Sequence, residues 1–245
     1  MHWDFALILI FLGGAVPLLG RRRIRQLMAM PETTKRDRLS LYASTIAFQW
    51  LASAVALWRA TAHGISAAQL GLAVPNLALT LVIASVLGAF VFANQVFSLR
   101  RLALRPEEIK GTLPQLALKI FPQDNVERLV FFALVVTVAV CEELIYRGFA
   151  QRVFENWSGG YVVAGIAESA ALFGLAHLYQ GRRGLAATFV VGLIFSGVRS
   201  WTGSLLAPLI AHFVTDMTAG LLAPPRLKQA LSRSATKTSQ SESVA

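Results

Sequence analysis

The sequence has a single cysteine, Cys141, and few charged residues. One thiol excludes an internal disulfide framework and every metal site built from several cysteines. Charged residues make up only 15% of the 245 positions, hydrophobic residues make up 55%, and the mean hydropathy is +0.57. Because a soluble globule carries far more charge on its surface, this composition excludes one and indicates a membrane protein.

Acidic residues are scarcer than basic ones, with 13 Asp and Glu against 23 Lys and Arg and a formal net charge of +10. In a chain this apolar, the basic excess is better explained as a membrane orientation signal than as a nucleic-acid footprint. We therefore expect the lipid bilayer as a partner, and no nucleic acid.

Seven apolar runs approach the length of about 20 residues that a spanning helix needs. They cover residues 3–19, 39–58, 77–99, 129–149, 161–179, 185–201 and 204–222. Each run must be helical, because unpaired backbone groups cannot face hydrocarbon and no run alternates as a barrel strand does. The sequence thus predicts an all-α polytopic membrane helix bundle with about seven transmembrane helices.

The positions of the basic residues predict the orientation of this bundle. The first apolar run is followed, not preceded, by arginines, so we interpret it as a retained anchor with its N-terminus outside. Residues 21–38, 100–128, 182–183 and the tail after 222 then hold 19 of the 23 basic residues in the cytoplasm. The Ala- and Arg-rich composition is typical of a bacterial source. We therefore expect an integral protein of the bacterial inner membrane with a cytoplasmic C-terminus.

Two segments outside the spans have their own character. Arg105-Pro106-Glu107-Glu108 is typical of a helix start, so we expect a cytoplasmic interfacial helix that ends near Phe121. After Pro224-Pro225 the chain becomes rich in Ser and Thr, which predicts a disordered tail. The expected divisions are N-terminal membrane helices with the interfacial segment over 1–125, a second helix bundle over 126–223, and a disordered cytoplasmic tail over 224–245.

Ionisable residues that interrupt the later apolar runs include Glu142, Glu143, Arg147 and Asp216. Facing lipid, these four would together cost about 10 to 14 kcal/mol on insertion scales, so they must face one another or water. Glu143 and Arg147 stand at i and i+4 and share a helix face, which predicts a structural ion pair. Glu142 is turned about 100° away on the helix and does not share that partner, so we interpret it as the carboxylate available for chemistry.

Two further pairs have the same i and i+4 spacing, Phe173 with His177 and His212 with Asp216. Each pair taken singly is compatible with ordinary packing. Three helices that each present a polar face to the bundle interior are better explained by a functional site, because a polar group without a task is readily replaced by an apolar one.

These residues resemble the motifs of a known family. Glu142 to Arg147 matches EExxxR, Phe173 to His177 matches FxxxH, and His212 to Asp216 stands where the family has HxxxN or HxxxD. Together they resemble the CPBP intramembrane endopeptidases, which include the Rce1-type CAAX prenyl proteases and the bacterial Abi proteins. The resemblance covers about residues 129–222, so the 126–223 bundle is expected to be CPBP-like and catalytic.

The resemblance implies roles for these residues. Glu142 would activate water with His177 beside it, His212 and Asp216 would stabilise the oxyanion, and Glu143 would belong to the same catalytic motif. The implied substrate is a membrane-associated peptide or protein. Family members have been described both as zinc metalloproteases and as glutamate proteases, which leaves Zn open as a cofactor. Its ligands would come from Glu142, His177, His212 and Asp216, although the sequence has no HExxH motif.

Three alternatives stay open from the sequence. The chain could be a non-catalytic scaffold or immunity protein of the same family, a proton-coupled transporter, or a haem protein with His177 and His212 as axial ligands. The expected helices also pose a problem of depth, because Glu142 would lie about 20 Å above the cytoplasmic edge and His177 only about 5 to 8 Å from it. We expect the Glu142 helix to resolve this by tilting and continuing to about Glu155.

Overall fold

The computed structural model describes residues 2–103 and 112–242, and all regular secondary structure in these ranges is helical. The elements are α1 (Trp3–Ile10), the π-helical η1 (Phe11–Ala15), α2 (Val16–Ala29), α3 (Lys35–Ala62), α4 (Leu77–Ala103), α5 (Thr112–Ile120), α6 (Asn125–Glu142), the π-helical η3 (Glu143–Ala150), α7 (Gln151–Trp157), α8 (Val162–Ala176), the 3-10 turn η4 (Leu178–Gln180), α9 (Gly181–Thr202) and α10 (Leu206–Glu242). The predicted all-α bundle is confirmed.

Within the described ranges, six helical stretches are long and apolar enough to cross a membrane. They are Trp3–Ala29, Lys35–Ala62, Leu77–Arg101, Asn125–Trp157, Leu178–Thr202 and Leu206–Leu227. The helix α8 is also apolar but is shorter, at 15 residues. Large apolar side chains such as Phe90 and Phe97 lie exposed on the outside of the bundle, as lipid contact requires. The chain is therefore an integral membrane protein.

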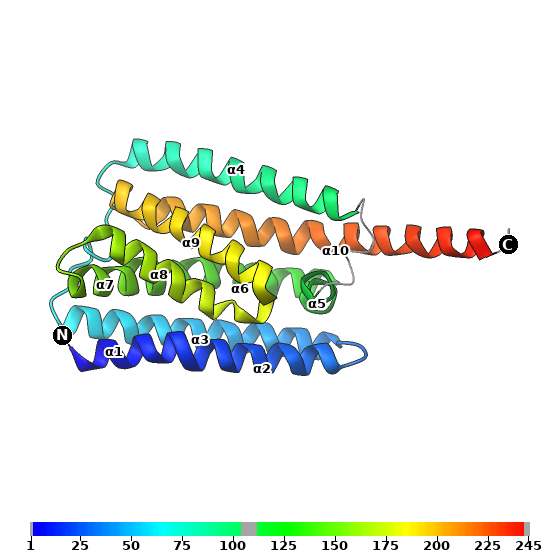
Figure 1. Ribbon diagram of the computed structural model, residues 1–245, viewed down its shortest axis with the longest axis horizontal. Helices are drawn as coiled ribbons and strands as arrows, with labels where there is room; N and C mark the ends of the chain where they lie inside the picture. Colours follow the sequence, from blue (N-terminus) through cyan, green and yellow to red (C-terminus); the bar gives the residue numbers. More distant parts are fainter. Residues whose placement is uncertain (1, 104–111, 243–245) are drawn as a thin grey trace.

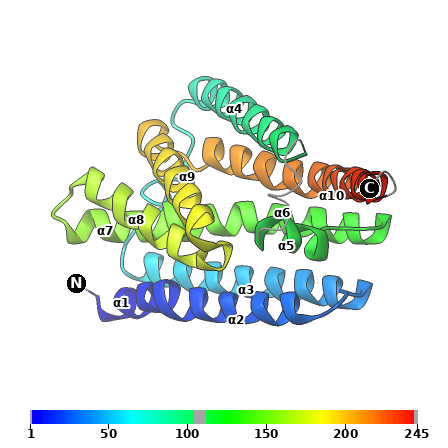
Figure 2. The same ribbon diagram turned by 45° about the vertical axis from the view of Figure 1, so that its right-hand side comes forward.

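The helices form three tiers that can be followed in both ribbon views (Figures 1 and 2). The α1–α2 helix and α3 lie side by side at one edge, α6, α7 and α8 lie in the middle, α10 and α4 form the other edge, and α9 crosses obliquely from that edge onto α8. The two chain ends lie at opposite ends of the bundle (Figure 1). The middle tier, which holds two of the three motifs, is thus enclosed by helices from both halves of the chain.

The central helix of the middle tier is unusually long. Asp124 caps its first turn by accepting a hydrogen bond from the Glu127 backbone, and the Lys35 ammonium beside Asp124 holds the pKa of that carboxyl below its usual range. From Asn125 the helix runs through η3 to Trp157, which is 33 residues or about 50 Å. This is longer than the hydrocarbon core of a bilayer, about 30 Å, so the helix must tilt or project from it.

The α8 helix differs from its neighbour in the opposite way. Its 15 residues span only about 22 Å, starting from the end of the bundle that holds the N-terminus (Figure 1). His177, which directly follows α8, therefore lies in the interior of the bundle and not near its far end. The long α6–α7 helix and the short α8 together remove the depth problem that the apolar runs alone predicted.

Two expectations from the sequence differ from the structure or lie partly outside it. The helix α5 falls within the expected interfacial helix, but the expected start at Arg105 lies outside the described residues. Where composition predicted a disordered tail, α10 continues through Pro224 and Pro225 to Glu242. Each proline removes one backbone donor, yet the residues that follow it include the good helix formers Leu, Lys, Gln and Ala, which favour continuation of the helix.

Candidate functional site

Three separate helices bring the motif residues to one place in the bundle. Glu142 and Glu143 lie at the junction of α6 and η3, Phe173 lies near the end of α8, and His212 lies in α10. The His212 ring contacts both carboxylates of the Glu pair, and it also faces the Phe173 ring at 6.2 Å between centroids. The structure thus joins the three motifs through direct contacts around His212.

Glu143 and Arg147 are fully buried and form the contact that their spacing predicted. Arg147 Nη1 donates to Glu143 Oε1 over 3.0 Å, and His212 Nδ1 lies 2.8 Å from the same oxygen. Since a carboxylate oxygen can only accept, Nδ1 carries the proton of the His212 ring. Glu143 therefore fixes the orientation of both Arg147 and His212.

Glu142 has a different environment from its neighbour. Its Oε1 accepts a hydrogen bond from Gln49 Nε2 over 2.8 Å, and Gln49 lies on α3. Its Oε2 is buried, lies 3.8 Å from His212 Nε2, and has no hydrogen-bond partner among the described residues. One oxygen of Glu142 is thus held in place while the other remains free to take a proton.

Phe173 is the aromatic centre of the cluster. The Arg147 guanidinium carbon lies 4.0 Å from the centre of the Phe173 ring, which is a close cation–π contact. The rings of Tyr146 and His177 also pack edge-on against Phe173, at 5.1 and 4.7 Å between centroids. The phenylalanine of the FxxxH motif therefore covers a buried cation and faces the rings of both histidines.

His177 and Asp216 complete the cluster from α8 and α10. His177 Nδ1 lies 2.9 Å from the Phe173 carbonyl oxygen, which accepts, so Nδ1 holds a proton and the neutral ring keeps its lone pair on Nε2. Asp216 Oδ2 lies 3.6 Å from His212 Nε2, and the Asp216 side chain is 35% exposed.

Contacts from other elements accompany the π-helical geometry of η3. Tyr146 O accepts the backbone N–H of Gln151, a bond between residues i and i+5, and it also accepts Ser169 Oγ over 2.6 Å. At Gly148, a Cβ atom would lie 3.0 Å from Leu70 O, so the glycine lets the loop after α3 approach the helix closely. Such π segments occur frequently at functional sites.

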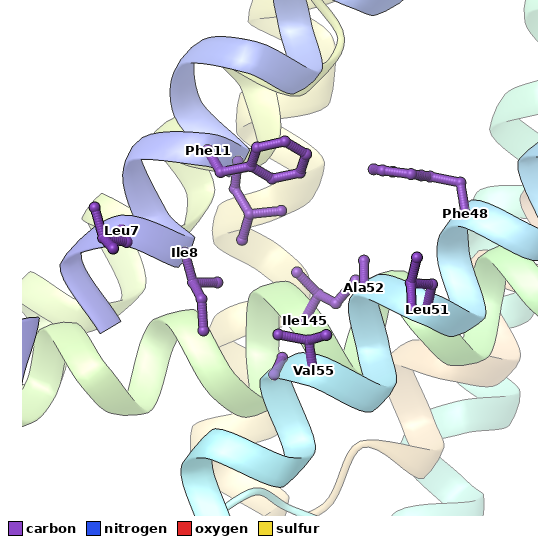
Figure 3. Close-up of a pocket in the computed structure, with 10 residues that line it drawn as sticks. Leu7, Ile8, Phe11, Phe48, Leu51, Ala52, Val55 and Ile145 are labelled. Atoms are coloured by element: carbon purple, nitrogen blue, oxygen red, sulfur yellow. The ribbon is translucent and has the colours of Figure 1, made fainter. Parts of the chain in front are cut away.

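An apolar cavity adjoins η3, which contributes Ile145 to its lining. Its volume is about 310 Å³, and it lies between α1 and α3 with Ile145 at its base (Figure 3). The lining side chains are Leu7, Ile8, Phe11, Leu12, Phe48, Leu51, Ala52, Val55, Ala56 and Ile145. None of them carries a polar side-chain atom, so the cavity offers room for apolar groups but no chemistry of its own.

A second buried polar cluster lies further along the same helix, and the sequence analysis did not predict it. Glu155 Oε1 accepts from Gln151 Nε2 over 3.0 Å and lies 3.5 Å from Arg199 Nη1, while Oε2 lies 3.4 Å from Arg152 Nη1. Gln151 Nε2 also donates to Ser200 Oγ over 2.7 Å. Both oxygens of Glu155 are therefore paired with cations, and α7 is joined to α9.

The candidate metal ligands do not meet the spacing of a metal site. Glu142, His177, His212 and Asp216 do not form a group whose donor atoms all lie within 4.8 Å of one another. In the part of the chain that the structure describes, the group that meets this spacing is His2, Asp4 and His63, at the end of the bundle where the chain starts. There, Arg59 already pairs with Asp4 at 2.6 Å and ties α3 to α1.

Gln49 is the contact of this site that sequence reasoning missed. The only available signal was an uncharged polar residue inside an otherwise apolar stretch, Ala47-Phe48-Gln49-Trp50-Leu51. Local spacing could not connect it to Glu142, because the two residues lie on different helices and are far apart in the chain.

Comparison with known proteins gives one finding for this region. Residues 124–218 match the family model of the type II CAAX prenyl endopeptidase Rce1-like proteins. The match contains all three motifs and covers less than half of the chain. Comparison with curated proteins and with solved structures gave no match. The chain is therefore a polytopic membrane protein whose residues 124–218 are similar to the Rce1-like family, as the motifs indicated.

Proposed function

We propose that this chain is an intramembrane endopeptidase that hydrolyses a peptide bond of a membrane-associated substrate with water activated by Glu142. The main support for this proposal is the environment of the Glu142 carboxylate. Gln49 donates a hydrogen bond to its Oε1, and its buried Oε2 has no hydrogen bond among the described residues. A general base needs such a free oxygen within reach of water. The match of residues 124–218 to an endopeptidase family supports the same reaction.

In the proposed reaction, Glu142 Oε2 takes a proton from water while the water oxygen attacks the substrate carbonyl carbon. The lone pair on His177 Nε2 orients the water. His212, placed among the carboxylates of Glu142, Glu143 and Asp216, acts from Nε2 as an imidazolium donor to the oxyanion. When the C–N bond breaks, protonated Glu142 returns its proton to the leaving amine, so protons balance over the cycle.

The proposal uses no metal ion, because the four candidate ligands lack the compact spacing of a metal site. Cleavage by the purified protein should continue after dialysis against a strong chelator. Loss of cleavage that zinc alone restores would replace this route with a metal-assisted one.

The defining experiment compares cells that carry the wild-type chain with cells that carry Glu142→Gln. Peptides and membrane-protein fragments that appear only with the wild type identify candidate substrates. Cleavage of one such substrate by the purified protein in H2¹⁸O should then place one ¹⁸O in the new carboxylate. If both strains yield the same fragments, cleavage does not depend on Glu142 and the proposed reaction fails.

We also propose the orientation that the basic residues predict, with the N-terminus outside and the C-terminus in the cytoplasm. In a Cys141→Ala background, a cysteine at exposed Ala68 should react with an impermeant thiol reagent in intact cells. A cysteine at exposed Glu32, in the α2–α3 turn, should react only after permeabilisation. The reverse pattern would invert the topology.

A further inference from the structure

The α3 helix turns a regular stripe of buried side chains toward the interior. Tyr42, Gln49, Ser53, Ala56 and Ala60 are its buried residues, and their spacing repeats every three, four or seven positions, which keeps them on one face. This face packs against α6, the helix that carries Glu142. Because a buried amide needs a partner in an apolar bundle, Gln49 on this stripe requires an explanation.

The partner of the Gln49 amide is the carboxylate of Glu142. Gln49 is 9% exposed, and its Nε2 donates to Glu142 Oε1 over 2.8 Å, which is the geometry of a strong charge-assisted hydrogen bond. A carboxylate held at one oxygen can no longer rotate freely, so its second oxygen keeps a defined direction. That second oxygen, Oε2, is the one that faces His212.

We propose that Gln49 is a positioning residue for the reaction, which it serves by fixing the carboxylate of Glu142 in its working orientation. This inference rests on the proposed function of Glu142 as the base. Gln49 lies outside residues 124–218, so the N-terminal half of the chain completes the site that the Rce1-like region begins.

Two neighbouring contacts between α3 and α6 provide a comparison. Trp50 Nε1 donates to Thr137 Oγ1 over 3.2 Å, and Ser53 Oγ donates to the Cys141 carbonyl oxygen over 3.5 Å. Both join the same two helices, but neither touches a carboxylate. If Gln49 only held the helices together, the loss of the Ser53 hydroxyl, also buried at this interface, should have a comparable effect.

The first test measures turnover of an identified substrate by Gln49→Met, which keeps the length of the side chain and removes the amide, and by Ser53→Ala as the matched control. We expect the kcat of Gln49→Met to fall about 10-fold to 100-fold with an unchanged KM, because the base is misplaced while substrate binding is kept. Ser53→Ala should stay within about twofold of the wild type. An unchanged kcat in folded Gln49→Met overturns the proposal.

The second test does not depend on proteolysis. A hydrophobic carbodiimide reacts with membrane-embedded carboxyl groups, and peptide mass spectrometry gives its rate of reaction at Glu142. A Glu142 carboxylate released from the Gln49 amide should react faster than in the wild type, whereas Ser53→Ala should leave the rate unchanged. Equal rates in Gln49→Met and the wild type overturn the proposal, whatever the activity.

A variant with a shorter amide side chain controls for a folding defect in Gln49→Met. Gln49→Asn keeps the polarity of the side chain but withdraws the donor by one methylene, so it should also increase the carbodiimide rate at Glu142. A wild type that cleaves nothing would refute the proposed function, and the labelling rates would still decide whether Gln49 restrains Glu142.

Discussion

Glu142 and Glu155 lie on the same continuous helix, and both are largely buried, yet their partners differ. Glu155 pairs with two guanidinium groups, those of Arg152 and Arg199, and accepts from an amide as well. Glu142 accepts from one amide, has His212 at 3.8 Å, and keeps one oxygen without a hydrogen bond in the described structure. Burial of a carboxylate therefore does not by itself indicate a role in chemistry.

The two glutamates differ in whether the carboxylate has an oxygen that accepts no hydrogen bond. A carboxylate whose oxygens are both paired with cations is held in one ionised state and cross-links helices. A carboxylate oxygen that accepts no hydrogen bond can take up a proton there, which a general base must do. This difference predicts that Glu142 is needed for activity and that Glu155 is needed for stability.

The largest expected effect is therefore a split between two matched substitutions. Glu142→Gln should lower kcat by about 10²- to 10⁴-fold, the range for loss of a general base, with little change in thermal unfolding. Glu155→Gln should instead lower the free energy of unfolding by about 3 to 5 kcal/mol, because it leaves Arg199 without its charge partner. Substrate turnover and thermal unfolding in detergent measure the two effects.

The comparison fails if the two variants behave alike. In particular, folded Glu155→Gln should retain the specific activity of the wild type. A loss of turnover in Glu155→Gln as large as in Glu142→Gln would show that the two clusters act as one unit.

The sequence predicted the fold well because apolar length and helical spacing are local properties. The expected span at 77–99 corresponds to α4, and the i and i+4 spacing correctly placed Arg147 beside Glu143. The apolar run alone ended near residue 149, but the depth argument correctly extended its helix to about Glu155, since the helix runs to Trp157. In the added turns, Gln151 and Glu155 bind residues of α9, and a contact between distant helices leaves no trace in local spacing.

The parts of the site that the sequence did not predict depend on contacts between helices. Motif residues could be chosen because each pair lies on one helix. The contacts that connect them, from His212 to Glu143 and from Gln49 to Glu142, cross between helices and depend on how the tiers pack. The π-helical turn likewise depends on Ser169 of α8, which bonds to the Tyr146 carbonyl from outside the helix.

The next effect concerns Glu143, which should behave like Glu155 and not like its neighbour in sequence. Glu143→Gln strands the fully buried Arg147 and should destabilise the protein by about 3 to 5 kcal/mol, measured by thermal unfolding. Adding Arg147→Met should recover part of this loss, because two well-packed neutral side chains need no charge partner. A single variant as stable as the wild type would show that the pair is not structural.

A smaller effect is expected at Asp216, on the exposed side of His212. Asp216→Asn removes a charge 3.6 Å from His212 Nε2, and an interaction with a charged group is worth about 1.5 to 3 kcal/mol. Turnover should therefore fall about 10-fold to 100-fold. An Asn variant with full turnover that extends to alkaline pH would instead favour Asp216 as a hydrogen-bond donor to the oxyanion.

The smallest effect tests whether the Glu155 cluster is independent of the site. Ser200→Ala removes the oxygen that accepts from Gln151 Nε2 over 2.7 Å, while the bond from Gln151 to Glu155 remains. Loss of one such hydrogen bond should cost about 1 kcal/mol in thermal unfolding. Turnover should stay within about twofold of the wild type, because Glu142 and His212 have no contact with Ser200. Ser85→Ala is the matched control, since that hydroxyl is exposed on α4 and bonds only to the carbonyl of Leu81 in its own helix. If Ser200→Ala lowers turnover as Asp216→Asn does, the stabilising cluster also sets the geometry of the site, and the division between the two glutamates no longer holds.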